Sequence, residues 1–315
     1  MSIIIIDNKE WVMKLVKKID IHAHITPYKH LCPNAMLSKV TMVDDNELIA
    51  IYDELNIEKG VLLPLVSPEY HSYVTTSAEA KLLSDKHPDR FVWFCNVDPR
   101  AYGHNPKAEL SEQLMFFKGL GAKGVGEVTA NIPADDPLMD NFFYHCAKCD
   151  MPVTIHIAPM SSQYGYYGIK DDLHLPRLEK MMNKHPDLKI LGHSQMFWSE
   201  LGDDVTEETR FIYPNSKVEG DGKIVKMLRE LPNLYCDLSA GSGLNALMRD
   251  KEYAARFIEE FSDRVLFGLD VCAPSNTHQY RYEEFLTRMV EDKYISEENY
   301  YKFVRGNAIK LLNIE

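Results

Sequence analysis

The chain has 315 residues, 45% of them hydrophobic and 26% charged, which is enough apolar material for one large globular core. Its 35 Lys and Arg stand against 47 Asp and Glu, and the net charge of -12 excludes the basic surface that a nucleic-acid binder needs. No apolar stretch approaches the roughly 20 residues that span a bilayer, and the start, MSIIIIDNKE, has neither the basic region nor the long apolar region of a signal peptide.

Short apolar runs alternate with amphipathic stretches along the whole chain. Several of these runs are continuously apolar, which is typical of parallel strands covered by helices. Eight runs predict strands: KKIDIHAHI (17–25), KGVLLPLVS (59–67), RFVWFCNVDP (90–99), AKGVGEVTA (122–130), MPVTIHIAP (151–159), LKILGHSQ (188–195), NLYCDLSAG (233–241) and RVLFGLDVC (264–272).

The stretches between these runs predict helices. In 44–60 the residues Leu48, Tyr52 and Leu55 fall on one stripe, with Asp44 as a helix cap. Eight consecutive strand–helix units predict an α/β protein folded as a single (β/α)8 barrel, with residues 1–315 as one domain. The main rival is an open doubly wound sheet. That fold usually carries a glycine-rich turn after its first strand, where this chain has His-Ala-His.

Six cysteines, at positions 32, 95, 146, 149, 236 and 272, are scattered along the chain. This usage is typical of reduced thiols, so we expect a cytoplasmic protein without disulfides. Cys146 and Cys149 form a C-x-x-C pair on a predicted helix. A zinc ribbon needs a second cysteine pair, which is absent, so we expect these two cysteines to be buried on a helix face.

Polar, titratable residues end several of the apolar strands. His22 and His24 close the first strand, and residues two apart on a strand point to the same side. His156 ends the fifth predicted strand, His193 the sixth and Asp270 the eighth. Barrel enzymes keep their chemistry at these carboxyl ends, so we expect the five side chains to converge on a divalent metal site.

These motifs resemble those of the amidohydrolase superfamily, in the amidohydrolase-related branch that includes aminocarboxymuconate-semialdehyde decarboxylase. The similarity rests on DIHAHI, TIHIAP, LGHSQ, LFGLD and the closing RGNAIKLL, which together span about residues 19 to 312. The resemblance implies that His22, His24, His156 and Asp270 bind a metal. It also implies that His193 lies beside the metal, as a further ligand or as an acid/base, and we favour the second role.

Glu127 ends the fourth predicted strand, where many relatives have a carboxylated lysine that bridges two metals. This chain has no lysine there. Glu127 is therefore a candidate metal ligand, and the alternative is a salt-bridged carboxylate near the barrel mouth. If it binds, a second metal becomes possible, because a carboxylate can bridge two ions about 3.5–4 Å apart.

Two enlarged loops, at 161–172 and about 199–222, would lie on the catalytic face of the barrel. Trp198, at the start of the second, is a candidate for stacking on the substrate. Arg249 is a candidate for binding a substrate carboxylate, and its alternative is a structural pair with Asp250 or Asp237. The substrate is expected to be a small molecule, and a homodimer would be unsurprising.

Three functions compete for this metal site. The main expectation is a metal-dependent hydrolase, in which the metal lowers the pKa of a bound water to about 7 and His193 or Asp270 moves the proton during attack on an amide, ester or lactone. The alternative is a metal-dependent non-oxidative decarboxylase of an unsaturated or aromatic carboxylic acid, which the branch also contains. A non-catalytic metal-binding barrel is disfavoured, because three histidines and an aspartate leave an open coordination position. The donors suit zinc, manganese or iron, and zinc is expected.

Overall fold

The computed structural model describes residues 16–31, 42–69, 74–160 and 167–314, and in them the predicted apolar runs form eight parallel strands. The strands are β1 (Lys18–Ala23), β2 (Ile57–Leu62), β3 (Phe91–Trp93), β4 (Val125–Val128), β5 (Val153–Pro159), β7 (Ile190–His193), β8 (Leu234–Leu238) and β9 (Val265–Phe267). A short additional strand, β6 (Ile169–Asp171), pairs with the end of β5 and was not predicted.

The eight strands form one ring. Ladders run β1-β2-β3 and β4-β5-β7-β8-β9. Single-residue bridges join the two ladders, from Cys95 to Val125 between the third and fourth strands and from Ala23 to Val271 between the first and the last. The predicted (β/α)8 barrel is therefore confirmed.

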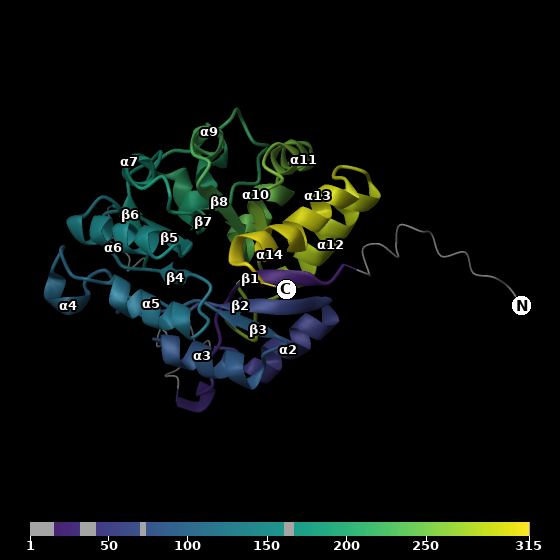
Figure 1. Cartoon of the computed structure of the whole chain (residues 1–315). Coiled ribbons are helices and arrows are strands. Elements are labelled where there is room, and N and C mark those ends of the chain that lie inside the picture. The colour runs from purple at the N-terminus through teal and green to yellow at the C-terminus, as the bar shows by residue number, and fades with distance from the viewer. Residues whose placement is uncertain (1–15, 32–41, 70–73, 161–166, 315) are drawn as a thin grey trace, which may run out of the picture.

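Helices lie around the outside of the strands (Figure 1). They are α2 (Asp45–Glu54), α3 (Ser77–Lys86), α4 (Ala101–His104), α5 (Ser111–Gly119), α6 (Pro137–Lys148), α7 (Pro176–Lys184), α8 (Gln195–Trp198), α9 (Lys223–Glu230), α10 (Ala240–Met248), α11 (Lys251–Glu260), α12 (His278–Glu291), α13 (Glu297–Tyr301) and α14 (Asn307–Leu312). Four single turns add to them: η1 (Lys29–Leu31), η2 (Ser199–Leu201), η3 (Thr209–Phe211) and η4 (Lys302–Gly306). None of the helices in the described residues is long and apolar enough to cross a membrane.

Helix α2 begins where its sequence predicts. The Asp44 side chain accepts from the backbone NH of Glu47, and the Glu47 side chain accepts in return from the NH of Asp44. Leu48 and Tyr52 are buried on the predicted stripe. Cys146, on α6, is also buried and free, as expected for a cysteine on an inward helix face.

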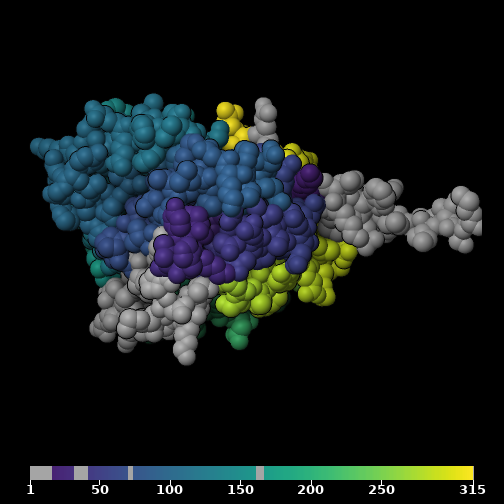
Figure 2. Space-filling model, turned by 90° about the horizontal axis from the view of Figure 1, so that it is seen from below, coloured from purple at the N-terminus to yellow at the C-terminus, as the bar shows by residue number. Residues whose placement is uncertain are grey.

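Helix α2, near the start of the chain, contacts helix α12, near its end. The hydroxyl of Tyr280, on α12, donates to Oε2 of Glu54, on α2, over 2.9 Å. Figure 2 shows the purple-to-blue N-terminal part of the chain beside the yellow-green segments near its end. Inside the barrel, Leu312 of α14 belongs to a buried apolar cluster with Ile19 of β1, so the closing helix completes the core.

Strand β3 is shorter than predicted, although backbone hydrogen bonds continue beyond it, from the NH of Phe94 to the carbonyl of Leu62 over 2.9 Å and from the NH of Cys95 to the carbonyl of Gly124 over 3.0 Å. The amide of Asn96 donates to the carbonyl of Pro64 over 2.7 Å and to the carbonyl of Glu127 over 2.6 Å. Asn96 thereby links the segment that follows β2 to strand β4. This crosslink lies directly behind a predicted site residue, Glu127.

Candidate metal centre

Two buried histidines at the end of β1 aim the same ring atom at one point. His22 donates from Nδ1 to Oδ2 of Asp237 over 2.6 Å, and His24 donates from Nδ1 to the carbonyl of Leu63 over 2.9 Å. These contacts turn the two Nε2 atoms toward each other, at a separation of 2.9 Å. Metal-binding imidazoles are held in this way, with one nitrogen anchored to an acceptor and the other left for the ion.

Two carboxylates complete this cluster. Oδ1 of Asp270 lies 3.8 Å from Nε2 of His22 and 3.7 Å from Nε2 of His24. Oε2 of Glu127 lies 3.3 Å from Nε2 of His24 and 3.8 Å from Nε2 of His22. Two ligands that each lie about 2.1 Å from a common ion are about 3–3.5 Å apart, so these donors need little movement to share a metal.

His193, at the end of β7, faces the same centre. Its Nδ1 lies 3.0 Å from the hydroxyl of Ser239, and its Nε2 lies 3.8 Å from both Oε1 of Glu127 and Oδ2 of Asp270. Burial, with the nearby His22 imidazole, lowers the pKa of His193 to about 4. His193 is therefore neutral near pH 7, and its Nε2 can accept a proton or bind an ion.

The donor atoms form two overlapping groups, each within 4.8 Å: His22, His24 and Asp270 in one, and His22, Glu127 and His193 in the other. The histidines and the glutamate are buried, while the side chain of Asp270 is 19% exposed. The centre therefore opens to its surroundings on the Asp270 side. This set of nitrogen and carboxylate donors fits a divalent metal such as zinc, manganese or iron.

The charges of the cluster also suit a cation. Burial lowers the pKa of His22, but the carboxylates of Asp237, Asp270 and Glu127 outweigh it and raise the pKa to about 10. Burial raises the pKa of Glu127, yet the histidines around it, His156 first, hold that pKa well below its usual value. Glu127 is thus ionised, and without a metal a proton on His22 supplies balancing positive charge.

His156 contacts Glu127 but is not itself among the converging donor atoms. Its Nδ1 is 2.7 Å from Oε1 of Glu127, and its ring packs on Tyr167 with 4.5 Å between centroids. It is in neither of the two donor groups. In this geometry Nδ1 of His156 faces Glu127, and its ring centroid lies 5.5 Å from that of His193, so the assignment of His156 as a ligand stays a prediction.

Asp270 reaches the cluster through an unusual backbone. It lies three residues beyond β9 and has a φ of 52°, in the left-handed region that residues other than glycine seldom adopt. Its NH donates to the carbonyl of His22 over 2.9 Å, and the NH of Leu269 donates to Oδ1 of Asp20 over 2.8 Å. The end of the last strand is thereby tied to the first at the height of the metal ligands.

Asp237 and Ser239, which orient His22 and His193, were not predicted as site residues. Asp237 is fully buried at the end of β8 and binds His22, rather than forming the structural pair with Arg249 that was considered. The available signal was the one used for the other strands, a titratable residue that ends an apolar run. Asp237 shows the same pattern near the end of the apolar run NLYCDLSAG.

The predicted loop position of Trp198 is wrong, because Trp198 is a buried residue of helix α8. Its side chain packs at ring distances of 5.2 Å from Phe197 and 6.4 Å from Phe257, and its indole NH donates to the carbonyl of Asp237 over 3.1 Å. The indole thus supports the strand that carries Asp237. A contact with substrate stays a prediction that this packing does not favour.

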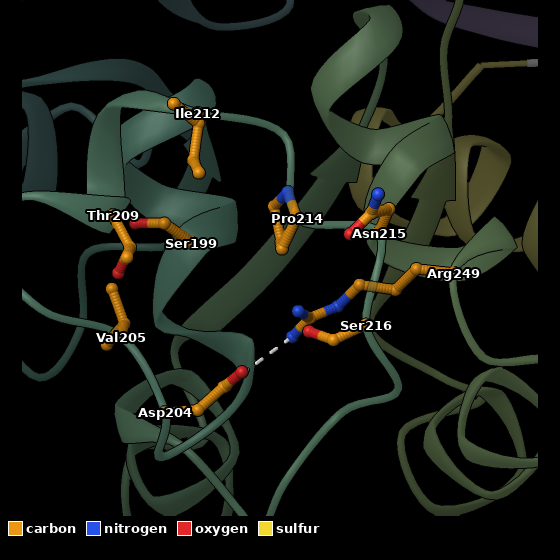
Figure 3. A pocket seen from close by; sticks show the side chains of 9 residues that line it. All are labelled: Ser199, Asp204, Val205, Thr209, Ile212, Pro214, Asn215, Ser216 and Arg249. Atoms are coloured by element: carbon orange, nitrogen blue, oxygen red, sulfur yellow. Dashed lines mark ion pairs between the residues drawn. The ribbon is translucent and has the colours of Figure 1, made fainter.

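Arg249 lines a cavity of about 170 Å³ behind the segment between β7 and β8 (Figure 3). Its side chain is 3% exposed, and its Nη2 lies 3.9 Å from Oδ1 of Asp204. The structural partner is therefore Asp204, not the Asp250 or Asp237 considered from the sequence. The predicted contact with a substrate carboxylate stays a prediction.

The chain matches one protein family in sequence and several solved structures in fold. Residues 19–314 match the model of the protein family described as amidohydrolase. The curated proteins, in contrast, include none that matches the sequence.

Solved structures with this fold include two decarboxylases. An uncharacterized TIM-barrel protein of Bordetella bronchiseptica is 17% identical over 94% of this chain and 98% of its own, with a TM-score of 0.61. 5-Carboxyvanillate decarboxylase of Sphingomonas paucimobilis is 14% identical over 95% and 100%, with a TM-score of 0.59. A dihydroxybenzoic acid decarboxylase of Polaromonas sp. JS666, with manganese and the inhibitor 2-nitroresorcinol bound, is 19% identical over 94% and 96%, with a TM-score of 0.57. At these identities the likeness establishes the barrel fold.

Proposed function

The chain belongs to the amidohydrolase family, and from this membership we propose that it uses a divalent metal to release carbon dioxide from an unsaturated or aromatic carboxylic acid. The observation that carries the proposal is the meeting of the His22 and His24 Nε2 atoms with two carboxylates at the open end of the barrel. The choice of decarboxylation over hydrolysis is supported by the decarboxylases among the solved structures of the same fold.

We propose His22, His24, Asp270 and Glu127 as the residues that would hold the metal, with His156 as a further candidate. The anchored Nδ1 atoms of His22 and His24 leave their Nε2 atoms as neutral donors once the proton on His22 is displaced. When bound, the ion would supply positive charge that holds the oxygens of an acidic substrate. Zinc is the ion expected from the sequence. The manganese bound in the Polaromonas enzyme supports manganese as an equal candidate.

Loss of carbon dioxide breaks a carbon–carbon bond and leaves the electron pair on a substrate carbon, which must then take a proton. Asp270 is the cluster carboxyl with access to the open side, at 19% exposure of its side chain. His193 stands 3.8 Å from Oδ2 of Asp270. We assign the delivery of this proton, taken up from solvent, to Asp270, and its relay to His193.

Hydrolysis of an amide, ester or lactone is the second candidate, and the description of the family favours it. The same side chains would serve, with His193 or Asp270 accepting a proton from water and returning it to the leaving group. The two reactions differ in their products, since hydrolysis releases no carbon dioxide.

A product assay separates them. Metal-loaded enzyme is incubated with a panel of hydroxylated benzoic acids, unsaturated acids and lactones, and both carbon dioxide and newly formed acid are measured. The proposal expects metal-dependent release of carbon dioxide that Asp270→Asn abolishes. Formation of acid without carbon dioxide would establish the hydrolase instead. An inert, fully loaded enzyme across the panel would contradict both.

A further inference from the structure

A tyrosine from the long segment between β7 and β8 packs on the start of α10, next to the segment that carries Asp270. The ring of Tyr213 rests against Gly241, on the first turn of α10, where an added Cβ would stand 3.4 Å from both the hydroxyl oxygen and Cε2. The neighbouring Ala240 donates its NH to the carbonyl of Leu269 over 3.3 Å. Leu269 immediately precedes Asp270, so the hydroxyl of Tyr213 lies close to the segment that carries this carboxylate.

Hydrogen bonds on both flanks hold Tyr213 in this position. The amide of Gln195 donates to the carbonyl of Ile212 over 2.6 Å, and the amide of Asn245 donates to the carbonyl of Pro214 over 3.1 Å. Gln195 follows His193 by two residues, and Asn245 lies on the helix that follows β8. The backbone around Tyr213 is therefore fastened to the helices that directly follow the strands bearing His193 and Asp237.

The direction of the side chain follows from its neighbours. Ile212 has extended backbone angles, with φ at -116° and ψ at 162°. Ile212 and Pro214 both line the cavity that contains Arg249, as Figure 3 shows. Adjacent side chains of an extended segment point to opposite sides. Tyr213 therefore points away from that cavity and toward Gly241, where its ring is found.

The hydroxyl of Tyr213 is available to a ligand. The residue is 53% exposed, and no hydrogen bond joins its hydroxyl to another residue in the described part of the chain. Other tyrosines use theirs inside the protein: Tyr52 donates to Asp20 and Tyr282 to the carbonyl of Leu238. Burial of part of the ring, together with the charge of Asp270, raises the pKa of Tyr213, so it is a donor at neutral pH.

We propose that Tyr213 is a positioning residue whose hydroxyl donates a hydrogen bond to an oxygen atom of the substrate held at the metal centre. This inference rests on the proposed function for the nature of the substrate, an acid with oxygen substituents. A held tyrosine loses little conformational entropy when it binds a ligand, so its hydrogen bond contributes to affinity and orientation.

The test removes the hydroxyl and keeps the ring. Manganese-loaded wild type and Tyr213→Phe are titrated with 2-nitroresorcinol, which carries phenolic oxygens but no carboxylate to lose, and binding is followed by its absorbance. The control is Tyr301→Phe, since Tyr301 is 44% exposed on α13, outside the site. One lost hydrogen bond predicts a dissociation constant about tenfold higher in Tyr213→Phe, with unchanged Tyr301→Phe. Metal content and melting temperature should match wild type in both.

Equal dissociation constants in the two variants would overturn the role of Tyr213. Failure of the wild type to bind the probe at millimolar concentration would overturn it as well, because the probe offers the oxygens that the hydroxyl is proposed to hold. Kinetics separate this inference from the proposed function. Tyr213→Phe should raise KM for a turned-over acid and leave kcat nearly unchanged. If the wild type releases carbon dioxide and Tyr213→Phe has an unaltered KM, the role of Tyr213 is rejected and the proposed reaction stands. If Tyr213→Phe binds the probe more weakly but the wild type decarboxylates no acid, only the proposed reaction is rejected.

Discussion

At the scale of single residues, the candidate site depends on the hydrogen-bond partner of each imidazole Nδ1 atom. Asp237 holds Nδ1 of His22 at 2.6 Å, and Leu63 and Ser239 orient His24 and His193 in the same manner. Such contacts decide which ring nitrogen faces the metal, so they control affinity without touching the ion.

Asp237→Asn should therefore weaken metal binding by about 10- to 100-fold while the chain stays folded. The amide keeps the shape of the carboxylate but loses the charge that favours the required ring orientation of His22. The measurement is a competition titration with a chelating dye. Asp263→Asn, at a side chain that is 67% exposed, is the matched control and should titrate like wild type. Equal affinity in Asp237→Asn would show that His22 is held by other means.

His193→Asn distinguishes an acid/base from a ligand. If His193 handles a proton, the variant keeps its metal and loses about 10²- to 10⁴-fold in rate. Metal content by elemental analysis and the rate of the metal-dependent reaction are compared on the same sample. An inactive protein that has lost its metal would assign His193 as a ligand instead.

Metal binding should also depend on pH with a definite sign. The pKa of His22 is raised from 6.5 to about 10, so the metal-free protein carries a proton there that the ion must displace. Apparent affinity should rise about tenfold for each unit of pH between about 6 and 8. The proton's contribution to the stability of the metal-free protein is complete below pH 6.5 and is lost as pH rises through 10.

A chelator competition at several pH values measures the slope. His22→Asn, which lacks the titrating ring, serves as the comparison and should bind weakly with a flatter dependence. A wild-type slope of zero would contradict the protonated empty site.

Much of the site could be predicted from its residues. His22, His24, Glu127, His193 and Asp270 each lie at or near the end of a predicted apolar run, and their convergence follows from barrel geometry. What the sequence could not supply was pairing across the barrel. Asp237 and His22 are 215 residues apart, and only the closed ring brings them into contact.

At the scale of elements, strand ends and tight packing behind them determine where the site residues stand. Gly192 of β7 lies against the ring of Phe197 on α8, so that an added Cβ would stand 2.2 Å from Cζ. Strand and helix approach closely because no side chain separates them. The strand prediction captured β7, but helix α8 was not predicted, since four residues are too few to show a helical period.

Gly192→Ala should consequently lower the free energy of unfolding by about 1–3 kcal/mol, because the buried Phe197 ring has to move. Gly119→Ala is the matched control. Gly119 ends α5 with no atom within 4 Å of an added Cβ, so alanine there should be neutral or stabilise by up to about 1 kcal/mol. Urea denaturation of both variants gives the comparison. Similar stability of the two would mean that the packing of α8 adapts freely.

At the scale of the whole molecule, the alternation of strands and helices was sufficient to predict the barrel. All eight predicted runs contain a strand, although β3 and β9 span only three residues each. Closure through the Ala23–Val271 bridge brings the first and last strands together, which is the step that joins the His-x-His motif to Asp270. The expected single domain, homodimer, cytoplasmic location and lack of nucleic-acid binding stay predictions.

The central claim is that one divalent ion is held where these strands meet. Diffraction data from crystals grown with manganese, collected near its absorption edge, test it most directly. The account predicts a strong anomalous peak about 2.0–2.3 Å from Nε2 of His22, Nε2 of His24 and a carboxylate oxygen of Asp270, with Glu127 or His156 nearby. Fully loaded crystals in which the peak lies elsewhere, with both Nε2 atoms free of metal, would contradict it.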